Sequence, residues 1–278
     1  MSEFQKVLKY FAIAFAIFLA VTIIGGMITG ILALAGIFTG GSSVKTIDLN
    51  QSFENVKSIT IEHGIGNLTV KEGDSDKVEV IGENVSENIV AEKNFSGNLS
   101  IRYKSSFFHW FNVNSLDGNN TRLTVYLPKG FIAENIEISA GAGNVNLENI
   151  KTENFEMDGG AGNINGENMV AGKVKIDGGV GEISLEEIDF TDANIDSGVG
   201  NIYMEGYLSG KNKINCGVGE VDLKLKGSID DYNIEVEKGL GNIYINGDKY
   251  SDVNWNNMTA PNELDIDGGV GNIRIDFE

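Results

Sequence analysis

Apolar and polar residues alternate along the second half of the chain in a pattern that repeats every 19 residues. Each repeat is marked by a Gly-x-Gly step, whose first glycine falls at positions 141, 160, 179, 198 and 217. Two further steps begin at Gly239 and Gly269, after longer intervals of 22 and 30 residues, and an outlying copy begins at Gly64. A fixed period of this length indicates a repeat architecture, because a single unit of this kind cannot bury its apolar face alone.

Within each repeat the apolar residues occupy alternate positions, which is the period of a β-strand. With the first glycine counted as position one, the fifth position is always Val or Ile: Val145, Ile164, Ile183, Ile202, Val221, Ile243 and Ile273. The seventeenth position is also apolar, in Met157, Ile176, Ile195 and Ile214. Units stacked as parallel strands would align these columns into ladders with a spacing of about 4.8 Å. The pattern therefore predicts an all-β fold, a parallel β-solenoid or β-helix-like stack, with its regular part over residues 131–278.

The glycines are expected to form the turns between the two strands of each unit, because glycine adopts positive φ without a Cβ penalty. The predicted turn glycines are Gly141, Gly143, Gly160, Gly162, Gly179, Gly181, Gly198, Gly200, Gly217, Gly219, Gly239, Gly241, Gly269 and Gly271. The residue between the two glycines is apolar in every copy, for example Ala161 and Val180. We expect this residue to point into the core.

Residues 45–130 are interpreted as irregular early coils of the same stack. Short runs rich in β-branched residues and bounded by Gly, Asn, Asp or Pro predict strands. These runs are Ser58–Glu62, Asn67–Val70, Lys77–Ile81, Asn98–Tyr103 and Arg122–Leu127. The steps at Gly66-Asn67-Leu68 and Gly97-Asn98-Leu99 echo the later Gly-Asn-Ile steps and are taken as related to them.

One insertion in this region, at residues 105–112, is rich in aromatic residues. Phe107, Phe108, Trp110 and Phe111 stand together without the alternation of a half-buried strand. One interpretation is a loop that caps the end of the stack, since solenoids need their ends covered. The other is an exposed interaction patch for a partner or for the outer interface of a bilayer, where Trp is favoured.

Residues 10–38 contain no charged residue and are long enough to cross a bilayer once as a tilted helix. We expect residues 1–44 to form a cytoplasmic stub, a transmembrane signal anchor and a short linker. A cleaved signal peptide is the alternative, because Ala33-Leu34-Ala35 resembles a cleavage site. Lys6 and Lys9 before the span favour a cytoplasmic N-terminus. The predicted location is the cell membrane, with a single pass and an extracytoplasmic C-terminal domain.

The overall charge restricts the partners that the protein can have. The formal net charge is −19 at pH 7, which argues against nucleic acid because phosphate binding needs clustered Lys and Arg. Cys216 is the single cysteine, so no intrachain disulfide can form. It occupies a position held by Gly or Ser in neighbouring repeats and is expected to be an inert small residue.

Two rows of polar residues flank the predicted turns. One row is Asp158, Asp177, Asp196, Asn215 and Asp267, and the other is Asn144, Asn163, Glu182, Asn201, Glu220, Asn242 and Asn272. Asn ladders can stabilise stacked coils through amide hydrogen bonds between side chains. Stacked aspartates repel unless a cation bridges them, which raises the alternative of a calcium-stabilised module. The liganding Asp position of calcium-binding repeats is Ile or Val here, so no metal or cofactor is expected.

An enzymatic role is the remaining alternative, as a carbohydrate-active β-helix. Carboxylates are plentiful, but no pair is singled out by spacing or by apolar surroundings that would raise a pKa. His63 and His109 are the only histidines, and neither lies in a metal-ligand or nucleophile motif. No catalytic residue is therefore assigned, and the protein is not expected to be an enzyme.

The repeated Gly-[Ala/Val]-Gly-[Asn/Glu]-[Ile/Val] units, the preceding Tyr126-Leu127-Pro128 and the N-terminal anchor resemble a known bacterial family. It is the family of membrane-anchored β-strand-repeat proteins, of the Gram-positive type, that are regarded as candidate adhesins and hold a domain of unknown function. The resemblance covers residues 45–278 and implies no catalytic residues. It implies surface interaction as an adhesin or a cell-envelope scaffold, with an unknown protein or envelope polymer as the partner.

Overall fold

The computed structural model describes residues 45–104, 120–255, 257 and 259–278, and this part of the chain is built of β-strands with one short 3₁₀ helix. The N-terminal elements are β1 (Thr46–Phe53), β2 (Ser58–Ile65), β3 (Asn67–Glu72), β4 (Val78–Ser86), β5 (Ile89–Lys93), β6 (Asn98–Tyr103), β7 (Arg122–Leu127) and β8 (Ala133–Ala142). The central strands are β9 (Val145–Ala161), β10 (Ile164–Val180), β11 (Ile183–Thr191), β12 (Ala193–Val199), β13 (Ile202–Ser209), β14 (Lys211–Val218) and β15 (Val221–Leu225). The C-terminal elements are η2 (Ile229–Asp231), β16 (Tyr232–Leu240), β17 (Ile243–Ile245), β18 (Asp248–Tyr250), β19 (Val253–Trp255), β20 (Asn262–Val270) and β21 (Ile273–Phe277).

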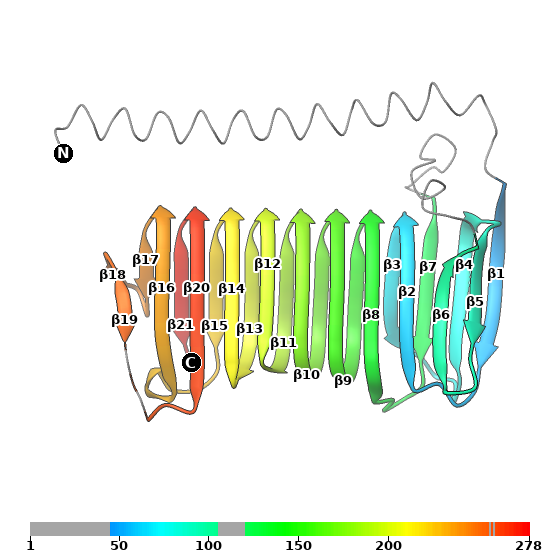
Figure 1. The fold of residues 1–278 in the computed structure, drawn as a ribbon, viewed down its shortest axis with the longest axis horizontal. Helices are drawn as coiled ribbons and strands as arrows, with labels where there is room; N and C mark the ends of the chain where they lie inside the picture. Colours follow the sequence, from blue (N-terminus) through cyan, green and yellow to red (C-terminus); the bar gives the residue numbers. More distant parts are fainter. Residues whose placement is uncertain (1–44, 105–119, 256, 258) are drawn as a thin grey trace, which may run out of the picture. The chain divides into compact units, whose positions relative to one another are not determined.

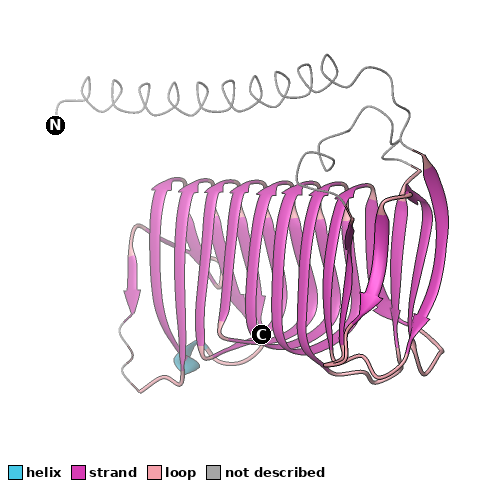
Figure 2. Cartoon of the chain, turned by 45° about the vertical axis from the view of Figure 1, so that its right-hand side comes forward, coloured by secondary structure: helices cyan, strands magenta, loops and turns pink. Residues whose placement is uncertain are grey.

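The strands form a stack with two faces, which we call the front sheet and the back sheet (Figures 1 and 2). The front sheet contains, in spatial order, β6, β2, β8, the second halves of β9 and β10, β12, β14, β20 and β16. The back sheet contains β7, β3, the first halves of β9 and β10, β11, β13, β15, β21 and β17. All these neighbours pair in parallel, as the 19-residue columns predict.

The spatial order of the coils differs from the chain order at both ends of the stack (Figure 1). The last coil, β20 and β21, lies between the β14–β15 coil and the β16–β17 coil. At the other end, β2 and β3 lie between the β6–β7 coil and the start of the regular repeats. The irregular intervals of 22 and 30 residues arise because the chain first forms the outer β16–β17 coil and leaves the adjacent place in the stack empty. It then returns and fills that place with the β20–β21 coil.

Antiparallel strands extend both ends of the parallel stack. β1 pairs with β4, β4 pairs with β7, and β5 pairs with β6. At the opposite end β18 pairs with β17 and β19 pairs with β16. β1 and β5 were not among the strands expected from the sequence. The aromatic insertion Phe107, Phe108, Trp110 and Phe111 lies outside the described residues, as does the predicted membrane segment 10–38.

The core lies between the two sheets and consists of the predicted aliphatic columns. Ile164, Ile183 and Ile202 of the back sheet are at most 3% exposed, and Ile176, Ile195 and Ile214 of the front sheet are fully buried. Each aliphatic side chain therefore packs against the equivalent residue of the next coil. Gly166 replaces an aliphatic residue in one column, and a Cβ there would meet the Met169 sulfur at 2.6 Å, so Met169 fills the space.

The two glycines of each step have different roles. The second glycine has positive φ throughout, for example 145° at Gly181 and 144° at Gly200, where residues with a Cβ are strained. The first glycine does not have positive φ, but a Cβ on Gly217 would lie 2.6 Å from the carbonyl oxygen of Gly198 in the adjacent coil. Glycine is required there by the close approach of two backbones.

The residue between the two glycines faces solvent, so the expectation that it points inward is wrong. Val180 is 50% exposed and Val199 is 38% exposed. Both residues lie at the end of a front strand, where the chain turns toward the back sheet, beyond the reach of the core. The apolar character of this position therefore does not reflect burial.

A second bend, which the sequence did not suggest, lies in the back half of each regular coil. Asn149, Asn168 and Glu187 have φ of 57°, 53° and 53°, the left-handed conformation that Asn tolerates better than most residues. The Asn168 amide donates to Asn149 Oδ1 in the preceding coil. The bend lies within the back strand of each coil, before the chain passes to the front sheet.

Candidate functional site

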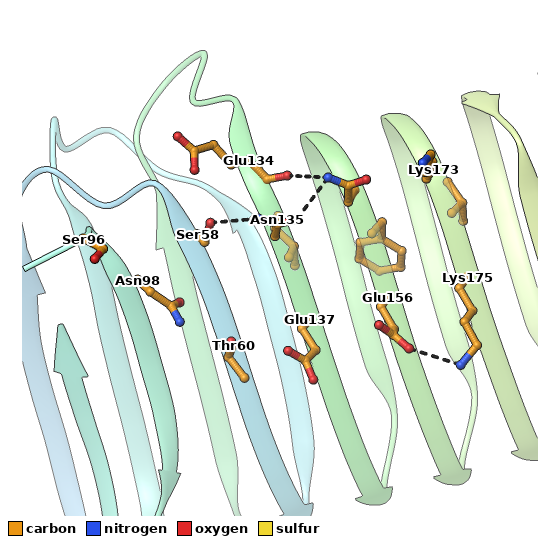
Figure 3. A pocket seen from close by; sticks show the side chains of 14 residues that line it. Ser58, Thr60, Ser96, Asn98, Glu134, Asn135, Glu137, Glu156, Lys173 and Lys175 are labelled. Atoms are coloured by element: carbon orange, nitrogen blue, oxygen red, sulfur yellow. Dashed lines mark hydrogen bonds and ion pairs between the residues drawn. The ribbon is translucent and has the colours of Figure 1, made fainter. Parts of the chain in front are cut away.

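A shallow hollow lies on the front sheet across β6, β2, β8, β9 and β10, and it has a volume of about 510 Å³ (Figure 3). Its floor is the surface of the sheet at Ile136, Phe155 and Val174 of three adjacent strands, whose side chains are buried in the core. Polar side chains of neighbouring strands surround this floor. The hollow therefore crosses the strands, parallel to the long axis of the stack.

The hollow arises from a change of side-chain size between adjacent coils. Thr60 of β2 pairs in register with Glu137 of β8, which in turn pairs with Glu156 of β9. Two residues earlier on the same face of these strands, Ser58 pairs with Asn135. The short side chains of β2 leave a depression beside the longer ones of β8, β9 and β10, whereas the backbone remains regular.

A chain of hydrogen bonds orders one side of the hollow (Figure 3). The amide of Asn154 donates to Asn135 Oδ1 at 3.0 Å and to the Glu134 carbonyl oxygen at 3.2 Å. The amide of Asn135 donates to Ser58 Oγ at 3.3 Å. These equivalent side chains hold one another in fixed orientations, so the row is preorganised for hydrogen bonding with a ligand.

The other side of the hollow carries charge of both signs. Lys175 Nζ lies 3.1 Å from Glu156 Oε1 and 2.8 Å from Asp177 Oδ2. Hydrogen bonds to these two carboxylates, with their charge, raise the pKa of Lys175. Glu137 and Lys173 add a carboxylate and an ammonium group to the lining. The hollow can therefore accept hydrogen bonds from, and donate them to, a ligand that carries hydroxyl, amide or mixed charged groups.

The carboxylates of the hollow are poorly placed for acid catalysis. Glu137 and Glu156 are adjacent in register but both are exposed, and Glu156 is ion-paired. A general acid at neutral pH is usually a carboxyl held in a buried, apolar site, whereas these two side chains are exposed. The geometry supports binding by hydrogen bonds.

The Asn row is ordered mainly by bonds to backbone N–H groups, although the Asn242 amide also donates to Asn272 Oδ1 at 3.4 Å, as the expected amide ladder requires. Asn144 Oδ1 accepts the backbone N–H of Asn163 at 3.1 Å, and Asn163 Oδ1 accepts that of Glu182 at 3.0 Å. The same bond links Asn201 Oδ1 to the N–H of Glu220 at 3.0 Å. Each Asn thus satisfies the N–H that follows the turn glycine of the next coil. The row is a structural element of the turn.

The Asp row lies on the front sheet, where its members are exposed or half-buried and pair in register. The pKa of Asp158 is raised, first by partial burial and then by the nearby Asp177 and Glu156, although Lys175 opposes this. No group of three or more His, Cys, Asp or Glu residues in the described ranges is arranged to hold a metal ion.

The two remaining candidates from the sequence lie in the core. Cys216 is buried and pairs in register with Ser197 and Gly268, which is the slot of small residues that the sequence predicts. His63 is 2% exposed, near the N-terminal end of the stack. His109 lies outside the described residues. These positions share no site with the hollow.

The asparagine and lysine residues of the hollow were not singled out from the sequence. Their signal is weak, because Asn135, Asn154 and Lys173 look like ordinary polar positions of a strand. The informative difference is Ser58 and Thr60 in β2, which can be aligned with Asn135 and Glu137 only when the 77-residue offset between these coils is known.

The chain matches the family described as Toastrack DUF4097 over residues 56–266. It belongs to this family. The match covers most of the parallel stack and confirms the predicted resemblance to β-strand-repeat proteins with a domain of unknown function. No match to this Toastrack chain was found among curated proteins.

Solved structures similar to this Toastrack protein include two that are described as candidates for adhesion. One is a cell adhesion candidate from Clostridium sporogenes, with 20% identity, 84% of this chain and 100% of that chain covered, and a TM-score of 0.39. Another is an adhesin candidate from Bacteroides fragilis, with 12% identity, 84% and 100% coverage, and a TM-score of 0.38. A third, described as a lipid-binding candidate from Parabacteroides distasonis, has 16% identity, 83% and 96% coverage, and a TM-score of 0.40.

Proposed function

We propose that this protein is a membrane-anchored, extracytoplasmic β-repeat protein that acts by surface interaction, as an adhesin or a cell-envelope scaffold, and not by catalysis. Residues 10–38 would anchor it, and the stack would be displayed outside the membrane. The hollow on the front sheet would bind an envelope polymer that carries hydroxyl and amide groups, such as a glycan. No helix in the described ranges combines the length and the apolar character needed to cross a bilayer.

The observation that carries this proposal is the ordered polar row beside the hollow. The bonds from Asn154 to Asn135 and from Asn135 to Ser58 fix three hydrogen-bonding groups at the spacing of adjacent strands, about 4.8 Å. A linear polymer laid across the strands would meet one such group for each coil. Extended repeat surfaces commonly bind in this way, with modest contributions from many equivalent contacts.

Retention of the full chain on insoluble cell-wall polysaccharide tests this proposal. We expect the Asn135→Ala/Asn154→Ala variant to be retained about tenfold less than the wild type, because two ligand-facing amides are lost. The matched control is Asn146→Ala/Asn165→Ala, which removes an equivalent amide pair, bonded at 3.0 Å, from the back sheet. Equal retention of the two variants would exclude the hollow as the site, and release of soluble sugar would instead support the enzymatic alternative.

Protease treatment of intact cells tests the proposed location. We expect cleavage sites within residues 45–278 to be accessible while the N-terminal residues stay protected. Complete protection of the C-terminal region would contradict an extracytoplasmic stack.

A further inference from the structure

A continuous row of aliphatic side chains runs along one edge of the stack. Each member is the last residue of a front strand, at the edge marked by the arrowheads of β2, β8, β12 and β16 in Figure 1. In spatial order the row is Ile65, Ala142, Ala161, Val180, Val199, Val218, Val270 and Leu240, with every neighbouring pair in register. We call these eight residues the apolar ridge.

The apolar ridge is accessible to a partner. Val180 and Val199 are 50% and 38% exposed, and the other members are exposed or half-buried. Glycine stands on both sides of each member from Ala142 onward, as Gly179 and Gly181 do around Val180. These neighbours have no side chains, so a partner can approach the ridge closely along its whole length.

An acidic row lines the front side of the ridge. It contains Glu62, Asp158, Asp177, Asp196, Asp267 and Glu237, and is interrupted by Ser139 and Asn215. The row on the back side is mostly asparagine and contains two acidic residues, Glu182 and Glu220. Within the part of the chain that the structure describes, Asp177 is the one member with an ion pair, to Lys175. Lys238 lies near the Leu240 end of the ridge and donates to the Gly241 carbonyl oxygen.

The charge of these rows decides between possible occupants. A second copy of the chain would bring its own acidic rows against them, and an anionic membrane surface would also be repelled. A partner with basic residues beside an apolar stripe would match both the ridge and its flanks. Charge complementarity of this kind favours encounter and excludes wrong partners.

The spacing along the ridge favours a helix over an extended strand. Ridge residues repeat about every 4.8 Å, the separation of adjacent strands. Apolar residues on one side of a helix repeat about every 5.4 Å, whereas residues on one side of a strand repeat about every 6.7 Å. The eight ridge positions span about 34 Å, close to the length of about 30 Å of a 20-residue helix.

We propose that the apolar ridge is a docking surface for a basic amphipathic helix of a partner protein. The helix would lie along the stack axis, with its apolar stripe on Val180 and Val199. Its basic side chains would reach Asp158 and Asp196 on one side and Glu182 on the other. This surface meets the front hollow at Asp177, the ion-pair partner of Lys175, but the ridge itself lies outside the hollow, so the inference does not depend on the proposed polymer binding.

The test uses the full chain, purified in a mild non-ionic detergent because of its apolar residues 10–38. The probe is a fluorescent 20-residue Lys/Leu peptide with Leu at helical i, i+3, i+4 spacing, and binding is followed by fluorescence anisotropy. We expect saturable binding of this peptide and much weaker binding of a scrambled peptide of the same composition. A Glu/Leu helix should not bind, because its charge matches that of the flanking rows.

Variants then locate the site. Val180→Ser/Val199→Ser should weaken binding about tenfold, whereas Val170→Ser, at a residue that is 40% exposed away from the ridge, should not. Asp158→Asn/Asp177→Asn/Asp196→Asn should weaken binding and reduce its dependence on salt. The matched control, Glu148→Gln/Glu167→Gln/Glu186→Gln, makes the same change in net charge on the back sheet and should bind as the wild type does.

Detergent partitioning of the peptide is the same for every variant, so differences between variants report the ridge. Equal affinity of the wild type and the Val180→Ser/Val199→Ser variant would overturn the proposal. A dimer that these two serines dissociate would also overturn it, in favour of a second copy. Equal binding of the Glu/Leu helix would show that charge complementarity plays no part.

Discussion

Val270 pairs in parallel register with Val218, although 52 residues separate them, and Leu240 pairs with Val270 from its other side. The chain therefore builds the β16–β17 coil before the coil that lies between it and the regular repeats. The antiparallel strands β18 and β19 return the chain to the gap, which β20 and β21 then fill. The last strands of the sequence are consequently held on both sides by earlier ones.

The cost of backbone contact at a turn glycine can be separated experimentally from the cost of positive φ. Gly200→Ala should destabilise the fold by about 2–4 kcal/mol, because it combines positive φ with overlap between a Cβ and the Gly181 carbonyl oxygen. Gly130→Ala, also at positive φ but with open space around a Cβ, should cost only about 1 kcal/mol. Denaturant unfolding of both variants measures the difference, and equal losses would mean that backbone contact between coils contributes nothing.

Removing Asn side chains that accept bonds from backbone N–H groups should lower the stability of the fold more than removing an exposed pair of amides. Asn163→Ala/Asn201→Ala removes the acceptors of the Glu182 and Glu220 N–H groups and should cost about 1–2 kcal/mol. Asn146→Ala/Asn165→Ala removes an exposed pair of side chains and should cost less than about 0.5 kcal/mol. Chemical denaturation compares the two. A larger effect of the second variant would contradict the assigned role of the row.

The burial of His63 predicts that this residue contributes to the loss of folding stability at acidic pH. Burial lowers its pKa from 6.5 to about 4, although a backbone group of Gly66 opposes the shift. The unfolded chain therefore takes up the proton first as the pH falls, so the stability conferred by neutral His63 is complete above pH 6.5. It is lost as the pH falls toward 4, by about 3 kcal/mol in total.

The variant His63→Leu isolates this component, because the carboxylates titrate in both proteins. The unfolding free energy of the wild type should fall more steeply than that of the variant between pH 6.5 and 4. Parallel pH profiles would show that His63 is not held neutral by burial.

Cys216 should react slowly in the folded protein. Its thiol is buried, and burial raises its pKa, so little thiolate is present at neutral pH. Iodoacetamide should modify it much more slowly in native buffer than in denaturant, as measured by intact mass. Similar rates in both conditions would mean that the front sheet opens readily around this strand.

The repeat period was enough to predict the core, because inward positions such as Ile176 and Ile195 must be aliphatic for a stack to form. It also located Cys216 in a slot of small residues. It misplaced Val180, since strict alternation says nothing about where a strand leaves the core. An apolar residue between two glycines looks buried in the sequence, and only the turn geometry shows that it faces outward.

The spatial order of the coils could not be predicted from the sequence, for a physical reason. Asn98 follows a glycine as Asn67 does, yet Asn98 pairs with Ser58 of the front sheet, whereas Asn67 starts a back strand. Local patterns specify strands and faces but not which distant strand becomes the neighbour. The hollow depends on such a neighbour relation, between Thr60 and Glu137, and so the sequence did not reveal it.

The out-of-order coils at both ends bear on how such a protein can change its length during evolution. Adding a unit after Phe277 would leave it no vacant side to pair with, because β15 and β17 already occupy both edges of β21. Duplicating one 19-residue unit in the middle, for example between Gly162 and Gly181, would insert a coil whose columns match on both sides. The out-of-order coils and antiparallel strands at both ends of the stack would be inherited unchanged. Relatives with longer or shorter stacks should therefore differ in the number of central units.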